Sequence, residues 1–225
     1  MNSPVGRFLG QDGVGILREA VTVLVVVVLG IVVAGCGVMG MSDEPPETEY
    51  NQAEAYGPME QAVRDTIEVL PDFPGFSARG WYELPCSHNG IDDPDYTNIE
   101  ITYSFGWDLS EDPMIREEYI DVLREHWEEQ GYAVRTDDGD GAGFYNLSVT
   151  REDGISLWYQ VWGMVNLVVQ SGCVPVSDMS EIDYIPPAGG IEPGSDGDGA
   201  DEYFPEGIPS GETSADAIAP FGETQ

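Results

Sequence analysis

The stretch that decides the fold is YNLSVTREDGISLWYQVWGMVNLVV, residues 145–169, in which apolar and polar side chains alternate between two short breaks that contain glycine. A period of two is typical of strands that bury one face. We interpret Glu152–Gly154, with Gly154 at positive φ, and Trp162–Met164 as three-residue hairpin loops. A two-residue Asp-Gly turn would instead place Val149 opposite Trp158. With the three-residue loops, apolar residues face each other in pairs: Val149 with Leu157, Leu147 with Tyr159, Tyr145 with Val161, Val161 with Val165, Tyr159 with Leu167 and Leu157 with Val169.

Two amphipathic helices are predicted upstream of this stretch. The first begins at Gly57-Pro58 and ends before Pro71, because proline fits the first helical turn and disfavours helix in the residue before it. The second is capped by Ser110 or Asp112 and ends at Gly131. Each helix has an apolar stripe with helical spacing: Met59, Ala62, Val63, Ile67 and Leu70 in the first, and Ile115, Tyr119, Val122, Leu123 and Trp127 in the second.

Further strands are predicted at residues 76–84 and 98–107, with a polar loop at residues 87–96 between them, and from Tyr132 to a turn at residues 137–141. The order is therefore helix, two strands, helix, four strands. A helix with one apolar stripe needs the apolar face of a sheet to cover. We predict an α+β domain in which both helices pack on one face of a mostly antiparallel sheet of about six strands.

The chain is strongly acidic. It contains 42 Asp and Glu residues against eight basic residues, all of them arginine, and its net charge is -34 at pH 7. This charge argues against nucleic acid as a partner, because phosphates attract cationic surfaces. It also argues against docking on anionic lipid through a basic patch. Solubility explains such a surface without any partner, and a cationic partner is the alternative interpretation.

The N-terminal region ends in a motif for lipid attachment. A Val-rich apolar run at residues 20–34 follows Arg7 and Arg18 and leads into Val33-Ala34-Gly35-Cys36. The aliphatic residue Val33 and the small residues Ala34 and Gly35 expose the backbone to a peptidase, and the thiol of Cys36 can form a thioether with a diacylglyceryl group. Here the chain resembles the bacterial lipoproteins. The resemblance implies cleavage after Gly35, a lipid anchor on Cys36 and a location on the extracytoplasmic face of the cell membrane.

An uncleaved transmembrane helix in a single-pass protein is the alternative, because no charge occurs between Glu19 and Asp43. Both interpretations leave the rest of the chain outside the cytoplasm, since basic flanks stay inside. The composition then divides the chain into four parts. These are a lipoprotein signal peptide at residues 1–35, the lipidated cysteine and a flexible acidic tether at residues 36–55, the α+β extracytoplasmic domain at residues 56–185 and a disordered acidic tail at residues 186–225.

The remaining cysteines form one pair. With Cys36 assigned to lipid, Cys86 after the first strand and Cys173 after the last strand are left in a compartment that permits oxidation. We predict a disulfide between them, and two buried free thiols are the alternative. The paired-cysteine α+β layout resembles that of small lipoproteins of high-GC Gram-positive bacteria.

The sequence contains no recognisable catalytic or metal-binding motif. Its two histidines, His88 and His126, do not lie in a metal-ligand spacing. The Asp-Gly runs at residues 137–140 and 196–198 do not continue into a complete calcium loop. We therefore expect no cofactor and a non-catalytic binding module. A cell-wall-acting enzyme or accessory subunit is the alternative, and it requires a pocket with a carboxylate pair or with His88 beside a carboxylate.

One surface is a candidate for binding. The hairpin register places Trp158 on the face opposite Leu157 and Tyr159, beside Val168, and leaves Trp162 at a hairpin tip. Exposed indole rings within a polar rim are the usual form of a docking site. We expect these residues to bind an envelope protein, a glycan or a small ligand. The alternative is that the tether, the start of the tail or a sheet edge covers them.

Overall fold

The computed structural model describes residues 48–88, 90–141, 143–200 and 204. The predictions for the signal peptide, for the lipidation of Cys36 and for residues 205–225 lie outside these residues. The described helices are α2 (Gln52–Glu68) and α3 (Tyr119–Glu129), with the short helical turns η1 (Leu109–Glu111), η2 (Met114–Glu118) and η3 (Met179–Glu181). The described strands are β1 (Ala78–His88), β2 (Ile91–Ser104), β3 (Ala133–Gly139), β4 (Tyr145–Thr150), β5 (Ser156–Val161) and β6 (Val165–Pro175).

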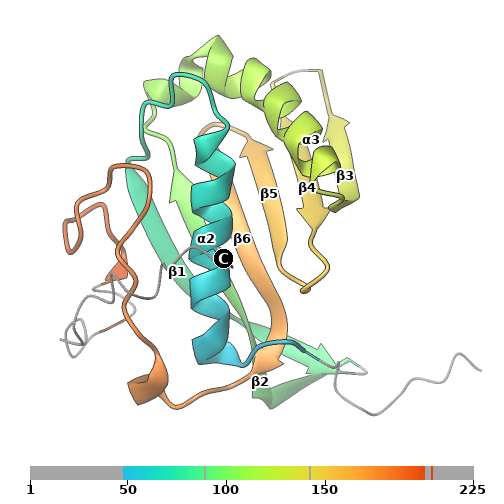
Figure 1. Cartoon of the computed structure of the whole chain (residues 1–225), viewed down its shortest axis with the longest axis vertical. Helices are drawn as coiled ribbons and strands as arrows, with labels where there is room; N and C mark the ends of the chain where they lie inside the picture. Colours follow the sequence, from blue (N-terminus) through green and yellow to red (C-terminus); the bar gives the residue numbers. More distant parts are fainter. Residues whose placement is uncertain (1–47, 89, 142, 201–203, 205–225) are drawn as a thin grey trace, which may run out of the picture. The chain divides into compact units, whose positions relative to one another are not determined.

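The described strands form one antiparallel sheet in the order β1-β2-β6-β5-β4-β3. The predicted hairpin register is confirmed, with Val149 opposite Leu157 and Val161 opposite Val165, and Gly154 has a φ of 86°. Helix α2 packs on β6 and β2, and α3 packs on β4. Both helices lie on the same face of the sheet (Figure 1). The predicted α+β fold is therefore confirmed.

The core lies between the helices and the sheet. Alternate side chains of the central strands point into it, and the apolar stripes of both helices close it from the other side. Its members with at most 1% exposure include Ile99, Ile101 and Tyr103 from β2, Tyr159 from β5, Leu167 from β6, Met59 and Val63 from α2, and Tyr119, Leu123 and Trp127 from α3. The other side chains of the same strands therefore point to the face that has no helix.

The predicted disulfide between Cys86 and Cys173 is present, with the two Cα atoms 5.8 Å apart. It joins β1 to β6, which are not neighbours in the sheet because β2 lies between them. The bond therefore fastens three strands together at one end of the sheet.

Helix α2 begins earlier than predicted, at Gln52, so the predicted tether at residues 36–55 is too long at its C-terminal end. Asn51 caps the helix, because its side chain accepts a hydrogen bond from the Glu54 N–H at 2.9 Å and the Glu54 carboxylate accepts one from the Asn51 N–H at 3.0 Å. Pro58 lies inside the helix rather than in its first turn. The reciprocal cap at residues 51–54 was the better signal for the start.

The second predicted helix is divided into the turns η1 and η2 and the helix α3. Asp112 is the cap of this segment, because its carboxylate accepts a hydrogen bond from the Met114 N–H at 2.9 Å. The hydroxyl of Ser110, the other predicted cap, accepts one from the Val165 N–H at 3.0 Å instead. Gly131 follows the end of α3 with a φ of 75°, as predicted.

The predicted polar loop at residues 87–96 is wrong, because β1 and β2 continue through it as a hairpin. His88 lies opposite Ile91 and Ser87 lies opposite Asp92, and the Ser87 hydroxyl donates a hydrogen bond to the Asp92 carboxylate at 2.6 Å. This part of the hairpin extends beyond the core, so polar side chains occur on both faces. The apolar alternation that marks a half-buried strand is therefore missing here.

The predicted disordered tail is also wrong for residues 186–200 and Phe204, which belong to the domain. Ala188, Ile191, Ala200 and Phe204 are buried. Residues 197–199 lie along the edge of β1, where the Arg79 N–H donates to the Gly197 carbonyl and the Gly199 N–H donates to the Arg79 carbonyl, both at 2.7 Å. A β-carbon at Gly197 or Gly199 would lie 2.6 Å from a backbone oxygen. The glycines therefore reflect close packing, although their abundance suggested disorder.

Candidate functional site

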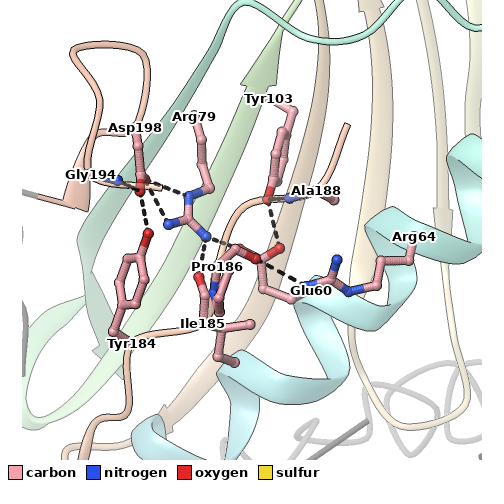
Figure 2. A network of polar contacts seen from close by, with 10 residues as sticks. All are labelled: Glu60, Arg64, Arg79, Tyr103, Tyr184, Ile185, Pro186, Ala188, Gly194 and Asp198. Atoms are coloured by element: carbon pink, nitrogen blue, oxygen red, sulfur yellow. Dashed lines mark hydrogen bonds and ion pairs between the residues drawn. The ribbon is translucent and has the colours of Figure 1, made fainter. Parts of the chain in front are cut away.

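A buried polar network holds the C-terminal segment of the described domain, residues 182–200, in place (Figure 2). Arg79 on β1 donates a hydrogen bond to the Glu60 carboxylate on α2 and another to the Asp198 carboxylate, each at 2.7 Å. Tyr103 donates to Glu60 at 2.7 Å, and Tyr184 donates to Asp198. The side chains of Glu60, Arg79 and Asp198 are at most 1% exposed. The network therefore connects α2, the sheet and the C-terminal segment within the protein.

The electrostatics of this network place one arginine between two carboxylates. Burial raises the pKa of Glu60, against the charge of Arg79 and the hydrogen bond from Tyr103. Burial also acts to raise the pKa of Asp198, but hydrogen bonds from the Gly194 N–H and the Tyr184 hydroxyl, together with Arg79, hold that pKa below its ordinary value. Since these groups face one another inside the domain, we assign the network a structural role.

The helix-free face of the sheet is rich in neutral polar side chains. Among the described residues, Asn98, Asn146, Asn166, Gln160 and Gln170 lie on this face. Its polar members on the central strands are Asn98, Glu100, Thr102, Ser104, Asn146, Ser148, Thr150, Ser156, Gln160, Asn166 and Gln170. Glu100 is the single carboxylate among them, although the chain as a whole is strongly acidic.

This face has a hollow of about 490 Å³ between two aromatic side chains. It is lined by Tyr82, Glu100, Thr102, Trp158, Gln160, Val168 and Gln170. The strand register places Gly80, Thr102, Val168 and Trp158 in one row across β1, β2, β6 and β5. Three strand spacings separate β1 from β5, which is about 14 Å.

The ring of Tyr82 forms one wall of the hollow because it leans back along β1 over Gly80. A β-carbon at Gly80 would lie 2.5 Å from the Tyr82 hydroxyl, so only glycine leaves room for the ring in this position. Tyr82 is 48% exposed. Trp158, which is half-buried, forms the opposite wall, and the buried Val168 lies beside it.

The polar groups at one end of the hollow are held by hydrogen bonds. Gln170 donates to one oxygen of the Glu100 carboxylate at 2.6 Å, and Thr102 donates to the other at 3.3 Å. Asn98 in turn donates to the Gln170 side-chain oxygen at 3.3 Å. Such a chain fixes the direction of each side chain before a ligand arrives.

The structure separates the three residues of the predicted binding surface. Trp158 and Val168 line the hollow, whereas Trp162 lies at the hairpin tip, outside its lining, 57% exposed and with its ring 5.4 Å from that of Phe144. Among the described residues, the hollow is lined by strand residues alone. The sequence prediction missed Tyr82, Glu100 and Gln170, because it assigned no register between β1, β2 and β6.

A second group of exposed aromatic side chains lies at the tip of the β5–β6 hairpin. Trp107 is 66% exposed and its ring lies beside Gly163, close to Trp162. Arg116 supports the tip, because its guanidinium donates to the carbonyls of Gly143 at 2.7 Å and Trp162 at 3.1 Å. Neither tryptophan belongs to the lining of the hollow.

Two groups of acidic side chains are relevant to the alternative interpretation that the protein is a cell-wall-acting enzyme. His88 lies 2.9 Å from the Asp93 carboxylate in the β1–β2 hairpin, where the backbone N–H of Asp95 and the histidine lower the pKa of Asp93. A second hollow, near the disulfide, is lined in part by Glu49, Glu152 and Asp153. Its Asp153 carboxylate already accepts hydrogen bonds from Arg151 at 2.6 Å, from Tyr50 at 3.2 Å and from the Ile155 N–H at 3.2 Å.

No family model matches the chain, and no curated protein or solved structure shows significant similarity to it. Within residues 48–88, 90–141, 143–200 and 204, no helix has the length and hydrophobicity needed to cross a membrane. The same residues contain no cluster of three or more His, Cys, Asp or Glu side chains that could hold a metal ion.

Proposed function

We propose that the protein is a lipid-anchored, non-catalytic binding module of the cell envelope, and that the hollow between Tyr82 and Trp158 is its ligand site. The observation that carries this proposal is the hollow itself. It combines two accessible aromatic rings with polar groups that are already oriented, on the face that neither α2 nor α3 covers. A concave site with a few convergent polar groups is the usual form of a ligand site.

The anchor is the part of the proposal that rests on Cys36 and the preceding residues Val33, Ala34 and Gly35. Mass spectrometry of membrane fractions should find Cys36 as an N-terminal diacylglyceryl-cysteine. A Cys36→Ala variant should remain unprocessed. A membrane-bound chain that begins at Met1 would contradict lipidation and would favour the uncleaved transmembrane anchor.

Oxidative footprinting tests the ligand site without knowledge of the ligand. The full chain is oxidised in the presence and absence of isolated cell envelopes, and the modified residues are identified by mass spectrometry. Envelopes should reduce the oxidation of Tyr82 and Trp158. The exposed Trp107, which lies outside the hollow, is the internal control and should be oxidised equally in both samples. Unchanged oxidation of Tyr82 and Trp158 would contradict the proposed site.

A cell-wall-acting enzyme or accessory subunit is the second candidate, because His88 lies beside the Asp93 carboxylate. An acid and a base at such a position could act on a glycosidic or amide bond. This candidate predicts that the protein releases soluble fragments from wall polymer and that His88→Ala abolishes the release. The binding module predicts no release from either protein.

A further inference from the structure

The ligand of the hollow can be assigned to a chemical class from its walls, its polar groups and its charge. We propose that it is an uncharged polysaccharide chain, bound with its sugar rings against Tyr82 and Trp158. This proposal rests on the proposed function, because it names the ligand of the same site.

The aromatic walls fit the apolar side of a sugar. A pyranose ring presents C–H groups on its faces and hydroxyls around its rim, so its face can stack on an indole or phenol ring. Tyr82 presents its ring beside the hollow because Gly80 lets it lie along the strand. Trp158 lies in the same row across the sheet, with Thr102 and Val168 between the two rings. A sugar chain that crosses this row would meet an aromatic ring on each side.

The polar groups fit the hydroxyl rim. Glu100, Gln170 and Gln160 present carboxylate and amide groups at the lining of the hollow, and Thr102 adds a hydroxyl. Carboxylates accept hydrogen bonds, and amides both accept and donate them, so this set can pair with several neighbouring hydroxyls. Hot spots of protein–protein interfaces are poor in Ser and Thr. The helix-free face instead carries hydroxyl side chains on three of its central strands, β2, β4 and β5, as at Ser104, Ser148 and Ser156.

The charge of the site indicates an uncharged ligand. The protein has a net charge of -34, which repels anionic polymers, and the described residues that line the hollow include no arginine to attract them. A cationic partner would be drawn to the many other acidic surfaces, whereas this face has Glu100 as the single carboxylate among its central polar residues. Glu100 is in addition engaged by Gln170 and Thr102.

The test measures binding of the full chain, purified in detergent, to insoluble wall polysaccharide that has been extracted with organic solvent from the cells that produce the protein. Sedimentation gives the bound fraction. Trp158→Ala should weaken binding by about tenfold or more, because it removes one stacking surface. Trp158→Tyr keeps an aromatic ring and should retain most of the affinity. Trp107→Ala removes a more exposed tryptophan outside the hollow and should bind like the native protein.

Three treatments identify the chemistry of the ligand. Protease digestion of the polymer should leave Trp158-dependent binding unchanged, and acid cleavage of its glycosidic bonds should abolish it. Raising the salt concentration from about 0.1 M to about 1 M should change the affinity by less than about twofold, because an uncharged ligand is not screened. If Trp158→Ala does not fold, Tyr82→Ala takes its place, since Tyr82 is 48% exposed.

The possible negative results distinguish the proposal of a polysaccharide ligand from the proposal that the hollow is a ligand site. Binding that depends on Trp158 but is lost after proteolysis, survives acid cleavage or falls steeply with salt would overturn the polysaccharide ligand and would leave the site in place. Absence of binding to the polymer, together with protection of Trp158 in the envelope footprint, would also overturn the polysaccharide alone. Binding that is equal in native, Trp158→Ala and Tyr82→Ala proteins would contradict both the ligand and the site.

Discussion

At the scale of single residues, two groups of side chains have different roles. Arg79, Glu60 and Asp198 are buried and paired with one another, so their effect is on stability. Tyr82 and Trp158 border an open hollow, so under the proposed function their effect is on binding. Substitutions in the two groups should therefore be separable by experiment.

Removal of one carboxylate from the buried network should destabilise the protein. Asp198→Ala leaves Arg79 with Glu60 as its remaining carboxylate and removes the acceptor for Tyr184 and for the Gly194 N–H. We expect a loss of about 3 kcal/mol in the free energy of unfolding, measured by urea denaturation. Asp196→Ala, at an exposed position two residues away, is the control and should change it by less than about 0.5 kcal/mol. Equal effects of the two substitutions would contradict the role of Asp198.

The stabilisation from Asp198 should depend on pH. Its pKa is lower in the folded than in the unfolded protein, so its contribution is present above the unfolded value of about 3.9 and is lost as the pH falls through the folded value. The raised pKa of Glu60 acts in the opposite direction, because it favours the folded state at lower pH. Asp198→Asn should therefore be less stable than the native protein at about pH 6 and should approach it towards about pH 2.5. A difference that stays constant over this range would refute the prediction.

At the scale of elements, strand pairing could be predicted from the sequence only where the two strands are close together in the chain. The hairpins of residues 145–169 were predictable, because the alternation and two glycine-containing loops fix their register within 25 residues. The pairing of β2 with β6 was not predictable, because it joins segments that are far apart in the sequence. Of the candidate site, Trp158 and Val168 followed from the first register. Glu100 and Gln170 meet through the second, and Tyr82 is added by the pairing of β1 with β2, for which no register was predicted.

Other elements were mispredicted because the same amino-acid composition occurs in more than one kind of structure. Glycines at residues 197 and 199 allow close packing on β1, but the same composition is typical of disordered segments. Polar residues at residues 87–96 belong to a hairpin that extends beyond the core, although polarity is also typical of loops. The contacts of residues 197–199 lie on Arg79, far away in the sequence, whereas residues 87–96 pair locally but without an apolar alternation to mark them as strands.

The disulfide is the element-scale feature with the largest expected effect. Cys86 and Cys173 are 87 residues apart, and for a loop of this length the chain-entropy model gives about 4–5 kcal/mol of stabilisation as an upper value. A Cys86→Ala/Cys173→Ala protein should lose up to this amount in denaturant titrations. Alkylation of the native protein without reduction should label neither cysteine. Labelling of both in folded protein would show that the bond is absent in solution.

At the scale of the whole molecule, the two faces of the sheet carry different features. One face carries the helices and the core, and the C-terminal segment is attached to the edge of β1 and to α2 by the buried network. The opposite face has neither helix and carries the hollow. This division leaves one face of the sheet accessible to a ligand in a domain whose stability is supplied from the other face.

The central claim is that the aromatic residues of the hollow serve a ligand and not the fold, and the free energy of unfolding of Trp158→Ala tests it most directly. Trp158 is half-buried on the helix-free face, so we expect a loss of about 1 kcal/mol, as for a partly exposed cross-strand contact. Trp127→Ala, in the core at 1% exposure, is the matched comparison and should lose about 3–5 kcal/mol. A loss for Trp158→Ala as large as that for Trp127→Ala would make Trp158 a core residue and would contradict the account.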